Sequence, residues 1–112
     1  MIKVGYSPQS LKDLQNIKKY ITDEYGADIA INIMRKITKD IRRLEMFPVS
    51  GQLISSIVKV PSDYYYLYSN KNYGFYRIEN ESVMIIRVLN EKQDYVQILF
   101  CLSQENGYEF DK

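Results

Sequence analysis

The chain has 112 residues, 46% of them hydrophobic, and a formal net charge of +1, so we expect one domain with its own apolar core. So small a charge argues against nucleic-acid binding driven by bulk electrostatics. The sequence has no histidine and one cysteine, Cys101, which excludes an internal disulfide and argues against zinc or another histidine-based centre. Without a long apolar run or a signal-peptide core, a cytoplasmic protein with no cofactor and no membrane contact is expected.

The first half of the chain carries the pattern of one strand and two helices. Residues 2–6 read as a short strand, and Ser7-Pro8 is typical of a helix start. Two apolar stripes follow, separated by Gly26, which suits a left-handed position at a helix end. The stripes are Leu11, Leu14, Ile17, Ile21 and Tyr25, then Ala30, Ile33, Met34, Ile37, Ile41 and Leu44. Two amphipathic helices joined by about three residues predict an antiparallel hairpin.

From Tyr64 onward the apolar period changes to two, which predicts strands at 64–69, 73–79 and 82–90. Asn70-Lys71-Asn72 and Asn80-Glu81 supply the turns. Residues 57–60 are either a short strand or an extended loop. The expected fold is α+β: a small twisted antiparallel β-sheet in β-α-α-β-β-β order, with the N-terminal helix hairpin packed on one face. The first strand is free to join an edge. The domain is expected to span 1–102, followed by a polar tail at 103–112.

The register of the last two strands decides where two strand arginines, Arg77 and Arg87, lie. With a two-residue turn at Asn80-Glu81, opposed residues share a face and the arginines fall on opposite faces. One face then carries Phe75, Arg77, Met84, Ile86, Val88 and Asn90, and the other carries Tyr76, Ile78, Val83, Ile85, Arg87 and Leu89. A slip of one residue would place both arginines on the same face.

A charge inside a strand must be paired or used. We expect Arg87 to form a structural ion pair, with Asp94 or Glu91 as its partner; the alternative is binding to a phosphate or an acidic partner side chain. Arg77 is either functional or extends to a sheet edge. Lys92 and Tyr95, beyond the last strand, are candidate functional residues because sites concentrate on such loops. The alternative for them is an ordinary solvated turn.

A run of tyrosines marks the third quarter of the chain. Its members are Tyr64, Tyr65, Tyr66, Tyr68 and Tyr73. Tyrosines can stack on nucleic-acid bases, but such a run more often alternates between the core and an exposed face that suits protein binding. The small net charge favours a protein partner.

The sequence resembles the RelE/ParE family of toxins from bacterial type II toxin–antitoxin systems. The resemblance rests on an ordered set of motifs: Ser7, Asp13-Leu14 and Ile17; Leu44, Pro48 and Gly51; Tyr73 and Tyr76-Arg77-Ile78; Ile86-Arg87-Val88-Leu89; Gln93-Asp94-Tyr95 and Leu99-Phe100. The resemblance implies the fold given above and a cognate antitoxin. It also implies that the toxin would contact operator DNA only through that antitoxin.

Members that resemble RelE cleave mRNA on the ribosome, whereas members that resemble ParE poison DNA gyrase. Cleavage needs a general acid, a general base and cations around the phosphate. RelE-like members carry lysine or arginine on the strand before the Tyr76 strand and at the start of the Tyr76 strand. By this resemblance, the corresponding positions of this chain hold Tyr65, Leu67 and Tyr73. Where many members carry histidine then arginine, it has Asn90 and Lys92. An amide cannot exchange protons near neutral pH, so the resemblance favours the ParE-like branch, with gyrase as target.

Two alternatives stay open. The chain is a ribosome-dependent mRNA endoribonuclease that uses the residues Arg77, Arg87, Lys92 and Tyr95, or it is an inactive relative that only binds its antitoxin. Asn90, Tyr65 and Tyr73 are the candidate binding residues under any of these readings.

Overall fold

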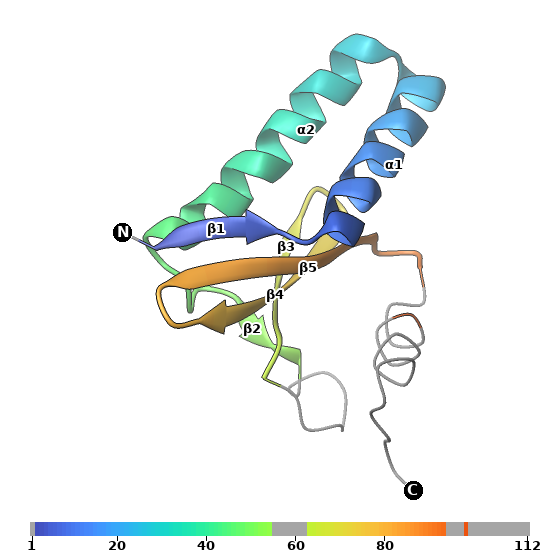
Figure 1. The fold of residues 1–112 in the computed structure, drawn as a ribbon. Helices are drawn as coiled ribbons and strands as arrows, with labels where there is room; N and C mark the ends of the chain where they lie inside the picture. Colours follow the sequence, from blue (N-terminus) through green and yellow to red (C-terminus); the bar gives the residue numbers. More distant parts are fainter. Residues whose placement is uncertain (1, 55–62, 94–97, 99–112) are drawn as a thin grey trace, which may run out of the picture.

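The computed structural model describes residues 2–54, 63–93 and 98 (Figure 1). Its elements are β1 (Lys3–Tyr6), α1 (Pro8–Tyr25), α2 (Ala27–Arg42), a 3-10 turn η1 (Arg43–Glu45), β2 (Gln52–Leu53), β3 (Tyr65–Ser69), β4 (Asn72–Glu79) and β5 (Ser82–Asn90). The helix pair lies on one side of the sheet, which confirms the predicted α+β class (Figure 1). The predicted strand or loop at 57–60, Tyr95 and the tail at 103–112 lie outside the described residues.

The five strands form one sheet in the order β1-β5-β4-β3-β2. Strands β2 to β5 are joined antiparallel, as predicted for β3, β4 and β5, whereas β1 pairs with β5 in parallel at the edge. The sheet is therefore mixed rather than purely antiparallel. Parallel pairing needs a long crossover, which here includes the helix hairpin and the β3–β4 hairpin. The two-residue strand β2 was not predicted.

The helix hairpin is tighter than its sequence pattern predicts. Gly26 alone connects the helices, at φ 98° and ψ 164°, so its φ is positive as expected but its ψ is extended. The second stripe is confirmed, because Ala30, Ile37, Ile41 and Leu44 are buried. The first stripe is wrong at both ends: Leu11 is 49% and Tyr25 is 61% exposed.

The buried residues at the start of α1 are polar instead. Ser10 and Asp13 are 0% and 6% exposed, because this end of α1 lies against the backbone edge of β5. The Ser7 side chain caps α1 by accepting a hydrogen bond from the Ser10 N–H at 3.0 Å, as predicted, and donates one to the Ile86 carbonyl at 2.8 Å. The helix start is thereby fixed to the strand.

A register shift between β4 and β5 corrects the predicted faces. Pairing begins as expected at the Asn80-Glu81 turn, but beyond Tyr76 it moves by one residue, so that Phe75 opposes Arg87. Val88 therefore joins the helix-side core with Tyr76, whereas Leu89 packs with Phe75 on the other side. By the same pairing rule Arg87 falls on the side of Phe75 and Arg77. The prediction that the arginines occupy opposite faces is wrong.

Candidate functional site

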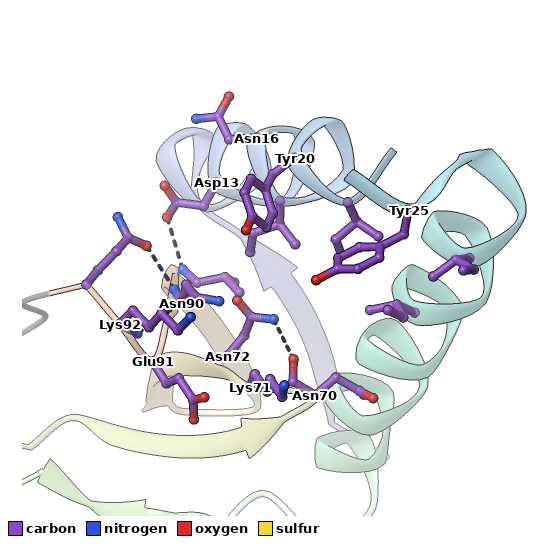
Figure 2. Close-up of a pocket in the computed structure, with 16 residues that line it drawn as sticks. Asp13, Asn16, Tyr20, Tyr25, Asn70, Lys71, Asn72, Asn90, Glu91 and Lys92 are labelled. Carbon is purple, nitrogen blue, oxygen red and sulfur yellow. Dashed lines mark hydrogen bonds between the residues drawn. The ribbon is translucent and has the colours of Figure 1, made fainter. Parts of the chain in front are cut away.

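A cleft of about 670 Å³ lies between the helix hairpin and the strand ends that carry Asn72 and Asn90 (Figure 2). Its apolar lining consists of Ile17 and Ile21 from α1, Ile29 and Ile33 from α2, and Val88 from β5. Asp13, Asn16, Tyr20 and Tyr25 line it from α1, and Asn70, Lys71, Asn72, Asn90, Glu91, Lys92 and Gln93 line it opposite. Such a concave site, with an apolar floor and polar groups at its rim, is the usual form of a ligand or peptide pocket.

Two turns build the polar rim of the cleft. Asn70 and Lys71 have φ values of 50° and 69°, as a two-residue type I′ hairpin requires, and they place Asn72 directly opposite Asn90. The second turn is tied to the first, because the Glu91 N–H donates to the Lys71 carbonyl at 2.8 Å. Asn90 Oδ1 accepts from the Lys92 N–H at 2.9 Å, which holds the second turn in place. Lys71 and Lys92 therefore stand on turns whose backbone is held in place by these hydrogen bonds.

Arg87 is held at the α1 end of the cleft by Asp13. Its Nε and one terminal nitrogen donate to the two carboxylate oxygens at 2.8 and 3.0 Å. The Val88 N–H donates to the same carboxylate at 3.0 Å. The two side chains are 14% and 7% exposed, so the pair is nearly removed from water. The structural ion pair expected for Arg87 is confirmed, but its partner is Asp13.

The prediction of Glu91 as the partner of Arg87 is wrong, and Asp94 lies outside the described residues. Glu91 instead accepts a hydrogen bond from the Tyr68 hydroxyl at 2.6 Å. That bond favours the protonated phenol and raises the pKa of Tyr68 above its ordinary value.

Arg77 is placed away from the cleft, near the β4–β5 turn. It pairs with Glu79, and its guanidinium lies 6.0 Å from the centre of the Tyr64 ring. The hydrogen bond to Glu79 raises the pKa of Arg77 above its ordinary value. Arg77 and Lys92 are thus not brought together in the cleft.

The tyrosine run alternates between the two faces of the sheet. Tyr65 stacks on buried Tyr76 with ring centres 5.4 Å apart, on the helix side. Tyr73 packs on the other side, against Tyr66 and Phe75. Neither Tyr65 nor Tyr73 lines the cleft; of the candidate residues, Asn90 and Lys92 do. The binding roles of Tyr65 and Tyr73 stay predictions, as does the role of Tyr95.

Sequence reasoning did not identify several residues of this site. Asn72 was assigned only to a turn, yet it is 3% exposed and lines the cleft. Asp13 was noted only for its part in the family resemblance. Tyr20 and Tyr25 are 59% and 61% exposed on α1. The sequence did contain one indication of the site, namely the two turns rich in amide side chains. Amides at the ends of two adjacent strands supply hydrogen-bond donors and acceptors to one place.

The match to a family model decides the broader identity. Residues 4–95 match the model described as the ParE toxin of the type II toxin–antitoxin system parDE. This chain belongs to the ParE toxin family. The predicted membership of the wider RelE/ParE group is therefore confirmed, and the family implies an antitoxin partner.

Two solved structures are similar in fold to this ParE-family chain. One is described as the chromosomal ParDE TA system from P. aeruginosa, with a TM-score of 0.69 and 16% identity over 80% of this chain and 96% of that one. The other is a YoeB/ParE toxin from Agrobacterium tumefaciens, with a TM-score of 0.53 and 15% identity over 80% and 98%. No curated protein matches the chain. Among the described residues, no helix is both long and apolar enough to span a membrane.

Proposed function

We propose that this ParE-family chain stops growth by docking on DNA gyrase, and that its cognate antitoxin neutralises it. The observation that carries the proposal is the commitment of both strand arginines to carboxylates. Arg87 is bound by Asp13 and Arg77 by Glu79. The Arg87 guanidinium is nearly buried in its pair and Arg77 lies away from the cleft, so neither is placed there to balance the charge that develops on a phosphate during RNA cleavage.

Freeing Arg87 for catalysis would be costly. The Asp13 carboxylate would be left almost fully buried, and among the described residues only the Val88 N–H and a long contact from Gln9 would offset its charge. Breaking a buried pair in this way typically costs about 3–5 kcal/mol. Lys92 remains near Asn90, but an amide cannot serve as its acid or base partner. The chemistry of the described residues supports binding rather than cleavage.

An exposed apolar segment after η1 supports a protein target. Met46, Phe47 and Val49 are 67%, 57% and 67% exposed, and they follow one another closely in the chain. Exposed apolar groups that cluster in this way mark protein–protein contacts more often than nucleic-acid contacts. We assign this segment, residues 46–49, to the contact with gyrase.

The decisive experiment compares two activities of the purified chain without antitoxin. Supercoiling by purified gyrase is expected to be inhibited, while mRNA 5′ ends mapped in a translating extract stay unchanged. Codon-phased mRNA cleavage that is lost on Lys92→Ala would overturn the gyrase proposal in favour of a ribosome-dependent nuclease. Absence of both activities, with no growth defect on expression, would leave an inactive relative that only binds antitoxin.

A matched pair of variants tests the docking segment. Phe47→Ser is expected to weaken gyrase inhibition, because it removes an exposed apolar contact without opening the core. Leu11→Ser makes a comparable change on α1, where Leu11 is 49% exposed and lines neither the cleft nor the 46–49 segment. It is expected to inhibit gyrase as the unmodified chain does. Equal inhibition by both variants would remove residues 46–49 from the interface.

A further inference from the structure

The outer face of α2 carries a stripe of exposed basic residues. At about 100° of rotation per helical residue, the five lie within an arc of about 120°, on the side opposite buried Ile37 and Ile41. Between positions 35 and 43 no other residue falls within that arc. The members of this basic stripe are Arg35, Lys36, Lys39, Arg42 and Arg43.

The small net charge of the chain conceals how strongly charge is concentrated on this face. Residues 35–43 hold five of the 15 basic residues and one of the 14 acidic ones, so they carry +4 and the rest of the chain carries −3. The one carboxylate, Asp40, accepts from Arg43 at 2.8 Å and from the Ser69 hydroxyl at 2.6 Å. The other four basic residues have no ion-pair partner in the part of the chain that the structure describes. Asp28, the second carboxylate of α2, lies seven residues before Arg35, about 10 Å along the helix axis.

Lys39 lies among like charges on every side along the helix. Arg35 and Lys36 precede it by four and three positions. Arg42 and Arg43 follow it by three and four. Residues at these spacings are neighbours on a helix surface, and like charges there destabilise the helix. The arrangement is therefore unfavourable in the free chain, and an anionic ligand that binds along the stripe would relieve it.

Stabilisation of the helix end accounts for only part of the stripe. Lys39 and Arg42 lie in the last turn of α2, where a positive charge offsets the negative end of the helix dipole. That effect falls off within the last turn, so it does not extend to Arg35 and Lys36. The length of the stripe thus indicates a second role.

We propose that the basic stripe binds the phosphate backbone of a DNA duplex, and that it does so on the DNA that gyrase holds. Eight helical steps of about 1.5 Å give the stripe a length of about 12 Å. One strand of a duplex advances about 3.4 Å per phosphate, so the stripe meets roughly three or four phosphates. Lysine and arginine bind phosphate oxygens through charge-assisted hydrogen bonds. The inference rests on the proposed function in taking gyrase as the enzyme that presents the DNA.

The make-up of the stripe favours a phosphate backbone over a membrane or an acidic protein. A membrane-surface helix buries its apolar face in lipid, whereas the apolar face of α2, with Ile37 and Ile41, is packed in the core. A protein partner is typically held by an aromatic or apolar anchor near the centre of the contact. The arc between positions 35 and 43 contains only cations, which suits a ligand with regularly spaced negative charge.

The basic stripe adjoins the segment that we assign to the gyrase contact. The stripe ends at Arg43, and residues 46–49 begin three positions later, after η1. The N–H groups of Met46 and Phe47 both donate to the Arg43 carbonyl, at 3.1 and 3.0 Å. The docking segment is therefore held at the end of the stripe. A chain docked through Phe47 places α2 beside the contact, where gyrase-bound DNA can lie along it.

The first test measures DNA binding by the full chain alone, through the fluorescence anisotropy of a labelled duplex of mixed sequence. The dissociation constant is expected to lie at about 10⁻⁴–10⁻⁶ M at physiological salt, and a plot of log affinity against log salt to have a slope of about −3. Arg35→Gln combined with Lys39→Gln is expected to bring the slope to about −1 and to weaken binding at least tenfold at low salt.

A matched pair of substitutions on α1 controls for net charge. Lys12 and Lys18 are exposed there, and Lys12→Gln combined with Lys18→Gln removes the same two charges. This control is expected to bind the duplex as the unmodified chain does. An equal loss in both double variants would show that total charge, and not the basic stripe, sets the affinity, and would overturn the proposal.

The second test compares binding of the immobilised chain to gyrase with and without duplex DNA. The unmodified chain is expected to bind the gyrase–DNA complex several-fold more tightly than gyrase alone. Arg35→Gln with Lys39→Gln is expected to lose this gain and to bind DNA-free gyrase as before, whereas Phe47→Ser weakens both. Duplex binding without any gyrase binding would overturn the proposed function and leave the DNA contact standing. Gyrase binding without duplex binding would do the reverse.

A thermal measurement separates ligand binding from a structural role. Lys39→Gln removes four like-charge contacts, so the free variant is expected to melt no lower than the unmodified chain although it binds the duplex more weakly. A clearly lower melting temperature would assign Lys39 to helix stability and contradict the proposal. Tighter binding to folded ribosomal RNA than to the DNA duplex would assign the stripe to the ribosome. Binding to phosphatidylserine vesicles without duplex binding would assign it to a membrane surface.

Discussion

Asp13 on α1 and Arg87 on β5 are 74 positions apart, yet they form the most buried ion pair among the described residues. The Asp13 carboxylate also accepts from the Val88 N–H on the free edge of β5. A single side chain therefore neutralises a strand arginine and satisfies the strand backbone. The pair fixes α1 along the edge that β1 leaves open, and so sets one end of the cleft.

Asp13→Ala is expected to destabilise the domain by about 3–5 kcal/mol, because it leaves Arg87 buried without a counter-charge. Arg87→Met is expected to cost less than Asp13→Ala, since the Asp13 carboxylate would keep the Val88 N–H. Urea unfolding at neutral pH measures both variants and the double variant. A double-mutant cycle with a coupling energy near zero would show that the pair contributes nothing as a unit.

The surface pair of Lys19 and Asp23 is the control for this prediction. Its side chains are 77% and 59% exposed at a spacing of four residues on α1. Exposed pairs of this kind typically contribute less than about 1 kcal/mol. Asp23→Ala is therefore expected to change the unfolding free energy only slightly, and a loss as large as that of Asp13→Ala would indicate a general weakening of α1.

The local elements of this fold were predicted well because their patterns are short-range. Strands expected at 64–69, 73–79 and 82–90 occur at Tyr65–Ser69, Asn72–Glu79 and Ser82–Asn90. The bulge opposite Phe75 was not predicted, because Ile85 and Ile86 are both apolar and give no sign of which one breaks the alternation. One inserted residue then exchanged the faces of Val88 and Leu89 and changed the side of Arg87.

The site was less predictable because its parts come from distant segments. Asn90 and Lys92 follow a strand end, and this local signal identified them. The pairing of Asp13 with Arg87 depends on how α1 docks, which a single sequence does not specify. Asn72 was assigned to a turn because asparagine is common in turns. Its burial results from the two-residue hairpin at Asn70-Lys71, which starts β4 one residue earlier than expected.

Tyr76→Phe is expected to cost about 1–3 kcal/mol although the ring stays in place. The buried hydroxyl donates to the Pro48 carbonyl at 2.9 Å and accepts from the Gly51 N–H at 3.1 Å. Phenylalanine would leave both loop groups without this partner. Thermal unfolding measures the loss, and Tyr68→Phe, on a tyrosine that is 52% exposed, is the control expected to lose much less.

The burial of Tyr76 also predicts that the domain becomes less stable in alkaline solution. Burial raises the pKa of Tyr76 above its ordinary value of 10.0, and burial also raises that of Tyr6. A raised pKa in the folded state means that the stabilising contribution is complete below pH 10 and is lost as pH rises toward the folded-state value. The unfolding free energy is expected to fall above pH 10, and less steeply in Tyr76→Phe. Parallel pH profiles of the two proteins would contradict this cause.

Gly26→Ala is expected to destabilise the helix hairpin although no atom obstructs the new methyl group. A Cβ at this position would meet nothing within 4 Å, so the cost is conformational. Gly26 has φ 98° and ψ 164°, a region that is essentially restricted to glycine, and an alanine there costs about 1–3 kcal/mol. Circular dichroism during urea unfolding measures the change. Ala27→Gly, at the first residue of α2, is the control, with an expected loss of no more than about 1 kcal/mol. If Gly26→Ala unfolds at the same urea concentration as the unmodified chain, the one-residue connection must relax to another conformation at little cost, and the hairpin would not depend on glycine.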